Sequence, residues 1–101
     1  MEAIRIELRG VAYRDNQWWI AHCLEMDVVA EGATPQEAIK DLLALCDLKI
    51  EDAIKEGDLQ SIFRPAPPEI WELYARATKK QLRRPLPRRV SRFDIRALEP
   101  V

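Results

Sequence analysis

At Glu31-Gly32-Ala33-Thr34-Pro35-Gln36-Glu37-Ala38-Ile39 an extended segment ends and one long helix begins. Thr34 is a suitable N-cap, because its hydroxyl can accept a hydrogen bond from the backbone N–H of Glu37 while Glu37 reaches back to the N–H of Thr34. Pro35 then occupies the first helical position, where its missing N–H donor costs nothing. These signals predict a helix that starts at Pro35.

The predicted helix continues to about Glu56, and Gly57 is the expected stop. At 1.5 Å per residue it would be about 33 Å long, whereas a six-residue strand spans only about 20 Å, so we expect its last two turns to extend beyond the sheet. Leu59, Ile62 and Phe63 are the nearest apolar residues that can cover these turns. One side of the helix is apolar at spacings of three and four: Ile39, Leu42, Leu43, Cys46, Ile50, Ala53 and Ile54.

The segments before the helix have the alternating pattern of strands. Residues 4–13 alternate apolar and polar side chains, although Gly10 is a place where a strand can break or bulge. A turn signal at 15–16 precedes a second strand over 18–23, and a third is expected over 27–31. The pattern predicts an α+β fold, in which a small antiparallel sheet of three or more strands packs on one long helix.

The second strand is apolar on both faces. Trp18 and Ile20 lie on one face, whereas Trp19, Ala21 and Cys23 lie on the other. A sheet that is backed by one helix should have one polar face, so something else should cover the second face. A second subunit, which would make the protein a homo-oligomer, and the C-terminal segment are the two candidates.

The C-terminal segment contains a second predicted helix and a late strand. The helix should begin at Pro68 with Glu69 in its first turn, and an extended Arg/Pro run follows at 84–89. Residues 93–97 alternate again and can add to an exposed sheet edge in the same or a neighbouring chain. We therefore divide the chain into a ββ(β)α domain at 1–64 and a C-terminal helix with a basic tail at 65–101. The last turn of the helix is expected to contain Arg76, Lys79, Lys80 and Arg83.

Charge is distributed unevenly along the chain. The net charge is −1, but residues 1–75 carry 7 Lys and Arg against 15 Asp and Glu, whereas residues 76–101 carry 9 against 2. The chain thus has an acidic body and a basic tail. Such a tail can meet nucleic acid, an acidic partner or the acidic body itself.

The sequence also indicates the cellular compartment of the protein. No run approaches the roughly 18 apolar residues of a membrane span, and the first residues lack the apolar block of a signal peptide, so we expect a cytoplasmic protein without membrane contact. In that reducing compartment Cys23 and Cys46 should be small core residues rather than a disulfide.

Residues for catalysis or metal binding are scarce. His22 is the one histidine, and because adjacent strand residues point to opposite faces, it cannot readily meet Cys23. No glycine-rich phosphate-binding motif is present among three glycines. We expect no catalytic residues, no metal, no cofactor and therefore no enzyme.

Two sets of residues are candidates for binding. A protein partner would be bound by apolar side chains, with His22 among them. Nucleic acid would be bound by arginines of the tail, in a manner that depends on salt and not on base sequence, since Phe93 is the one aromatic residue between them. The partner-binding candidates are Trp18, Trp19, Ile20, His22, Trp71, Phe93 and Ile95, and the nucleic-acid candidates are Arg83, Arg84, Arg88, Arg89, Arg92 and Arg96.

The segments 13–23, 28–32 and 34–38 together resemble the HicB family of antitoxins, in which a tryptophan or tyrosine strand is followed by a Gly-x-Thr-x-x-Glu-Ala helix start. Gly32, Thr34, Glu37 and Ala38 match that start. The resemblance covers about residues 4–57 and implies a HicB-like domain, related to an incomplete double-stranded-RNA-binding fold. It also implies a partner, a HicA-like ribonuclease toxin that the protein neutralises.

Two alternatives remain beside the antitoxin. The basic tail could make the chain a nucleic-acid-binding regulatory protein, or the chain could be a stand-alone oligomeric module that serves assembly. Many HicB proteins repress their operon through a separate DNA-binding domain, but residues 58–101 show neither a helix-turn-helix nor a ribbon-helix-helix pattern.

Overall fold

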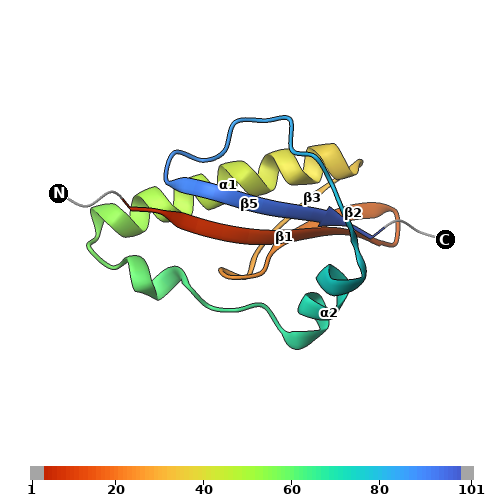
Figure 1. The fold of residues 1–101 in the computed structure, drawn as a ribbon, viewed down its shortest axis with the longest axis horizontal. Coiled ribbons are helices and arrows are strands. Elements are labelled where there is room, and N and C mark those ends of the chain that lie inside the picture. The colour runs from red at the N-terminus through yellow and green to blue at the C-terminus, as the bar shows by residue number, and fades with distance from the viewer. Residues whose placement is uncertain (1–3, 99–101) are drawn as a thin grey trace.

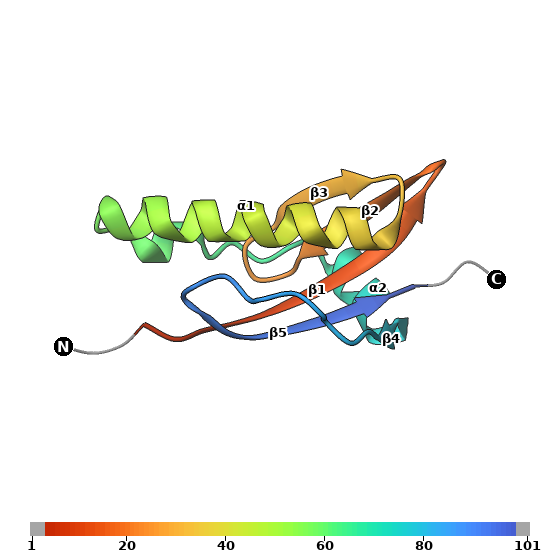
Figure 2. The same ribbon diagram turned by 90° about the horizontal axis from the view of Figure 1, so that it is seen from above.

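A five-stranded mixed sheet lies between two helices in the computed structural model, which describes residues 4–98. The long helix covers one face of the sheet and the short helix covers part of the other (Figures 1 and 2). The predicted α+β fold with a second C-terminal helix is therefore confirmed. In chain order the elements are β1 (Ile6–Asp15), β2 (Trp18–Cys23), β3 (Val28–Gly32), α1 (Pro35–Lys55), the 3-10 helix η1 (Leu59–Ile62), α2 (Pro68–Arg76), β4 (Thr78–Lys79) and β5 (Val90–Ala97), and the strand order is β3-β2-β1-β5-β4.

Strand β1 runs without interruption through Gly10, so the break considered there does not occur. A Cβ atom at this position would lie 2.9 Å from Cδ1 of Ile95 and 3.0 Å from Cε1 of Phe93. The absence of a side chain at Gly10 thus leaves room for two large side chains of β5 to pack over β1. At its end β1 turns through Asn16, at φ 59°, into the antiparallel strand β2.

Strand β5 pairs with β1 in parallel, with Leu8 opposite Phe93 and Gly10 opposite Ile95. The late strand predicted from the alternation thus exists, and it adds to the sheet of its own chain. The three strands predicted to be antiparallel, β1, β2 and β3, are antiparallel, whereas β5 is parallel to β1, because the segment between α1 and β5 returns the chain to the end where β1 begins (Figure 1). The sheet therefore joins residues from both ends of the chain.

Helix α1 begins at the residue predicted for it. The hydroxyl of Thr34 accepts from the N–H of Glu37 at 3.2 Å, but the carboxylate of Glu37 accepts from the N–H of Ala33 at 3.1 Å rather than from that of Thr34. Glu56 is the C-cap, and Gly57 follows in the left-handed conformation at φ 69°. The capping signals therefore located both ends of the helix.

The main core lies between α1 and the sheet. The C-terminal end of α1 extends past the start of β1, as expected (Figure 2), although β1 with ten residues spans about 33 Å, close to the roughly 31 Å of the 21-residue helix. Leu59 and Ile62 pack against this core as predicted, whereas Phe63 is 38% exposed.

A smaller apolar cluster lies on the opposite face, where Tyr74 of α2 packs against Val11 and Leu24. Of the two candidates for covering this face, the C-terminal segment is the one that the structure shows. Helix α2 ends at Arg76, earlier than predicted, because Ala77 is extended (φ −84°, ψ 160°) and the next two residues form β4 beside β5. The basic residues from Lys79 onward are therefore not helical.

Within residues 4–98, neither long helical segment combines the length and the apolar character required to span a bilayer.

Candidate functional site

The predicted partner-binding residues lie on both faces of the sheet. Trp19, Phe93 and Ile95 point toward α1 and are buried in the main core. They hold α1 against β2 and β5, and as core residues they are not accessible to a partner in the folded chain.

The other four predicted residues belong to the face that α2 partly covers. Ile20 and His22 are buried, and Trp71 packs beside the smaller cluster with its Nε1–H donating to the carbonyl of Ala66 at 3.2 Å. Trp18 is 45% exposed. Of the seven candidates, Trp18 thus has the accessibility that a contact residue requires.

Trp18 and Val29 are exposed apolar side chains on the same face of the sheet, and together with the buried Ile20 we call them the outer patch. Val29 was not among the predicted contact residues, and it is 47% exposed on β3. The outer patch lies beside the open side of β3, which is the last strand of the sheet and pairs only with β2 among the described residues. Two carboxylates flank the patch, because Asp15 pairs in register with Trp18 and Glu31 with Ile20.

A hydrogen-bonded group of three side chains supports the end of β2 that is farther from Trp18. Nε2 of His22 lies 2.6 Å from Oδ1 of Asp27, and Nδ1 lies 3.4 Å from the hydroxyl of Tyr13. Because a carboxylate can only accept, Nε2 carries the proton and Nδ1 can accept from Tyr13. Burial, with the charges of Asp15 and Asp27, raises the pKa of Tyr13.

A second polar group ties α2 to β5. The hydroxyl of Tyr74 donates to Oδ2 of Asp94 at 2.5 Å, while Arg96 lies over the Tyr74 ring at 4.1 Å and donates to its carbonyl at 3.2 Å. Burial and the hydrogen bond to Asp94 raise the pKa of Tyr74. These contacts join α2 to β5, so we assign the group a structural role rather than a role in ligand binding.

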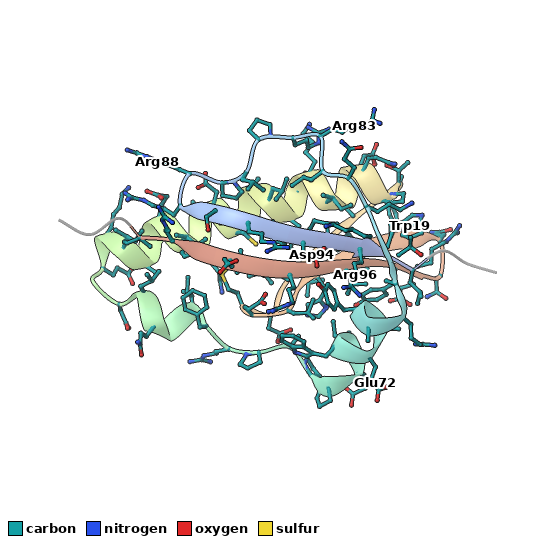
Figure 3. All side chains as sticks on the ribbon, in the orientation of Figure 1. Trp19, Glu72, Arg83, Arg88, Asp94 and Arg96 are labelled. Carbon is teal, nitrogen blue, oxygen red and sulfur yellow. The ribbon has the colours of Figure 1, made fainter. Side chains whose placement is uncertain are left out.

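The six predicted nucleic-acid-binding arginines do not form one surface. Arg89 pairs with Glu51 at 3.3 Å and Arg96 is held by Tyr74 and Asp94, so these two neutralise acidic residues of the same chain. Arg92 lies on the α2 side of the sheet, whereas Arg83 and Arg88 lie along the loop that runs beside α1 (Figure 3). The tail thus contains two kinds of arginine: some pair with acidic residues of the same chain, and others are exposed.

A pocket of about 640 Å³ lies where this loop passes the first turns of α1. Its cationic residues are Lys80, Arg83 and Arg84, and its apolar residues are Pro35, Ile39 and Leu82, with Gln36 and Gln81 completing the wall. The sequence indicated the arginines but not the pocket, because the approach of the loop to α1 is a contact between residues more than 40 positions apart.

Cys23 and Cys46 are both free and buried in the main core, as predicted. The hydrogen bond with Cys23, together with burial, raises the pKa of the Cys46 thiol. Such a thiol stays protonated at neutral pH and is a poor nucleophile. Among the described residues, no group of three or more His, Cys, Asp or Glu side chains is placed to hold a metal ion.

Comparison of the chain with protein-family models, with curated proteins and with solved structures gave no match.

Proposed function

We propose that the protein is a HicB-like antitoxin, which binds a HicA-like ribonuclease toxin and neutralises it, and that the outer patch forms the center of the contact. The observation that carries this proposal is the exposure of Trp18 and Val29 beside a sheet edge that has an open side. Exposed tryptophan in such a position is typical of the residues that contribute most to binding energy at protein interfaces.

The edge of β3 gives the partner a second means of attachment. A strand with one neighbour presents unpaired N–H and C=O groups, and a strand of another protein can bind to them by extending the sheet. Val29 and Glu31 point from this strand to the side of the outer patch. Backbone pairing and side-chain contact would thus act on one surface.

Charge favours a toxin of this kind. A ribonuclease must bind the phosphates of RNA, so its surface carries basic residues. The first 75 residues of this chain carry an excess of acidic residues, and Asp15 and Glu31 lie directly beside the outer patch. Charge of opposite sign at an interface increases the rate of association and selects the partner.

Co-expression with a HicA-like protein encoded beside the gene, followed by affinity purification, tests the proposal. We expect a complex that inhibits RNA cleavage by the toxin, and we expect Trp18→Ala combined with Val29→Ala to weaken it strongly. Phe63→Ala is the matched control, because Phe63 is a comparably exposed large apolar residue outside the outer patch.

The proposal fails if no complex forms, or if the control weakens the complex as much as the double variant does. Deletion of the basic tail is not a suitable test, because it removes β5, which lies inside the sheet between β1 and β4.

A further inference from the structure

The side of α1 that faces away from the sheet carries two exposed leucines that do not belong to the outer patch. Leu48 is 60% exposed and Leu45 is 40% exposed, and the two are neighbours at a spacing of three residues on the helix. Two leucines are too small a surface to identify a partner, so the charged residues around them decide what can bind there.

Exposed residues continue this surface in both directions along α1. They follow one another at spacings of three and four residues, so they share the helix face of Leu48 and lie opposite the buried residues that pack on the sheet. We call this set the α1 stripe, and all of its members are exposed: Glu37, Lys40, Ala44, Leu48, Asp52 and Lys55.

The charges of the α1 stripe are self-complementary about the level of Cys46, near the middle of α1. Glu37 and Lys55 lie nine positions on either side of that level. Lys40 and Asp52 lie six positions on either side of it. A second α1 helix that runs antiparallel therefore places each lysine of the stripe opposite a carboxylate of the other chain.

The same two-fold arrangement places Ala44 opposite Leu48 of the second copy, because both lie two positions from the level of Cys46. A small residue opposite a large one allows two helices to approach closely, and contact of this kind removes the exposed leucine from water. The unfavourable pair in this register is Asp41 with Glu51, but Glu51 already pairs with Arg89 of its own chain at 3.3 Å.

Contacts within the chain leave the charges of the α1 stripe available. Among residues 4–98, Lys40, Asp52 and Lys55 form no ion pair. The carboxylate of Glu37 accepts a hydrogen bond from the N–H of Ala33 and has the capacity for more.

The order of the charges selects between kinds of partner. Negative and positive residues alternate along the α1 stripe, so a partner surface of one charge sign, such as nucleic acid, would meet like charge at half of these positions. A second copy of the chain meets opposite charge at all of them. The alternation therefore favours self-association.

We propose that the protein forms a symmetric dimer in which the α1 helices of two copies pack antiparallel through the α1 stripe. Such an interface is isologous, since both chains contribute the same residues to it. The outer patch lies on the face of the sheet opposite to α1, so the dimer leaves both outer patches free. This inference therefore does not depend on toxin binding, and either one can fail without the other.

Sedimentation equilibrium of the full chain tests the inference by charge reversal. The unmodified protein should form a dimer at concentrations up to about 0.5 mM, because an interface of one helix per chain is small and its affinity is expected to be modest. Lys40→Glu brings carboxylates of the two chains together, and Asp52→Lys brings ammonium groups together. Each variant should weaken the dimer about tenfold or more.

An equimolar mixture of Lys40→Glu and Asp52→Lys distinguishes this arrangement from any other dimer. In the mixture each reversed charge faces a residue of opposite sign, so we expect a heterodimer about as stable as the unmodified dimer. Lys49→Glu is the matched control, since it makes the same change of charge at an exposed position of α1 outside the α1 stripe and should leave association unchanged.

Three results would overturn the inference. The first is an unmodified protein that remains monomeric at the highest concentration. The second is a dimer that both single variants preserve, or that the control variant weakens as much as they do. The third is a mixture of the two variants that associates no better than either variant alone.

Discussion

A hydrogen bond joins His22, near the end of β2, to Asp27, which is in the left-handed conformation at φ 52°. Nε2 of His22 lies 2.6 Å from Oδ1 of Asp27. The ring of His22 is buried, so its N–H needs an acceptor within the protein. The carboxylate supplies that acceptor while Asp27 forms the turn into β3. One residue thus provides both a backbone conformation and a hydrogen bond.

We expect Asp27→Ala to lower the free energy of unfolding by about 1–2 kcal/mol, because it leaves the buried N–H without its partner and places alanine at a positive φ. Asp27→Asn keeps an acceptor and a residue that tolerates this conformation, and it should lose clearly less. Urea unfolding followed by tryptophan fluorescence measures both. Equal stability of Asp27→Ala and the unmodified protein would contradict the role given to this hydrogen bond.

Tyr74→Phe should destabilise the protein by about 1–2 kcal/mol at pH 7, because Asp94 loses its donor while its Oδ1 is already buried without a hydrogen-bond partner among residues 4–98. Urea unfolding at pH 7 measures this loss. An unchanged midpoint of unfolding would show that the hydrogen bond between α2 and β5 contributes nothing.

The same tyrosine predicts a dependence on alkaline pH. Its pKa is raised in the folded chain, so the fold favours the neutral phenol, and this contribution is complete below the unfolded pKa of about 10 and is lost as pH rises through the folded value. Stability should therefore fall above about pH 10, and less so in Tyr74→Phe. Unfolding curves between neutral and strongly alkaline pH test this, and identical alkaline losses in the two proteins would exclude Tyr74 as a source. A smaller loss should persist in the variant, because the pKa of Tyr13 is raised as well.

Gly32→Ala should be more destabilising than its exposure suggests. A Cβ atom there would lie 2.7 Å from the backbone nitrogen of Ala38, which belongs to the first turn of α1 and cannot move independently. We expect a loss of about 2–3 kcal/mol, typical of overpacking. Gly57→Ala is the control, because a Cβ atom there meets nothing within 4 Å and the cost is limited to about 1 kcal/mol for the left-handed backbone. Thermal unfolding ranks the two variants, and the reverse order would refute the close approach at Gly32.

Ellman's reagent should not react with the folded protein at a measurable rate, because both thiols are buried and the pKa of Cys46 is raised. Denaturation in urea should release two reactive thiols per chain, and Cys46→Ala should release one. Rapid reaction of the native protein would show that one of the cysteines is accessible.

The parts of the fold that were predictable depend on local signals. Thr34, Pro35 and Gly57 located both ends of α1, because caps and helix stops act on residues within one turn. Alternation revealed β1 and β5 for the same reason. The parallel placement of β5 was not predictable, because the pairing of Leu8 with Phe93 joins positions that are far apart in sequence. Nothing in the local pattern of either strand specifies its neighbour.

In the candidate site, too, local features could be predicted from the sequence and contacts between distant segments could not. Alternation placed Trp18 and Trp19 on opposite faces, but it could not tell which face α1 would cover, so both were predicted as contacts. Val29 was overlooked because a single valine in a short strand has no feature that marks it as exposed. Arg89 and Arg96 were grouped with the other arginines, since an ion pair with Glu51 or a contact with Tyr74 depends on how distant segments meet.

The position of β5 inside the sheet has a consequence for how the chain matures on the ribosome. A nascent chain that has released only β1, β2, β3 and α1 holds one side of β1 without its neighbour, since β5 is synthesised after them. Until residue 97 leaves the exit tunnel, that side of β1 remains available to other nascent strands. The sheet is therefore expected to be completed only after β5 has emerged, which favours a protective role for holdase chaperones that bind the incomplete sheet.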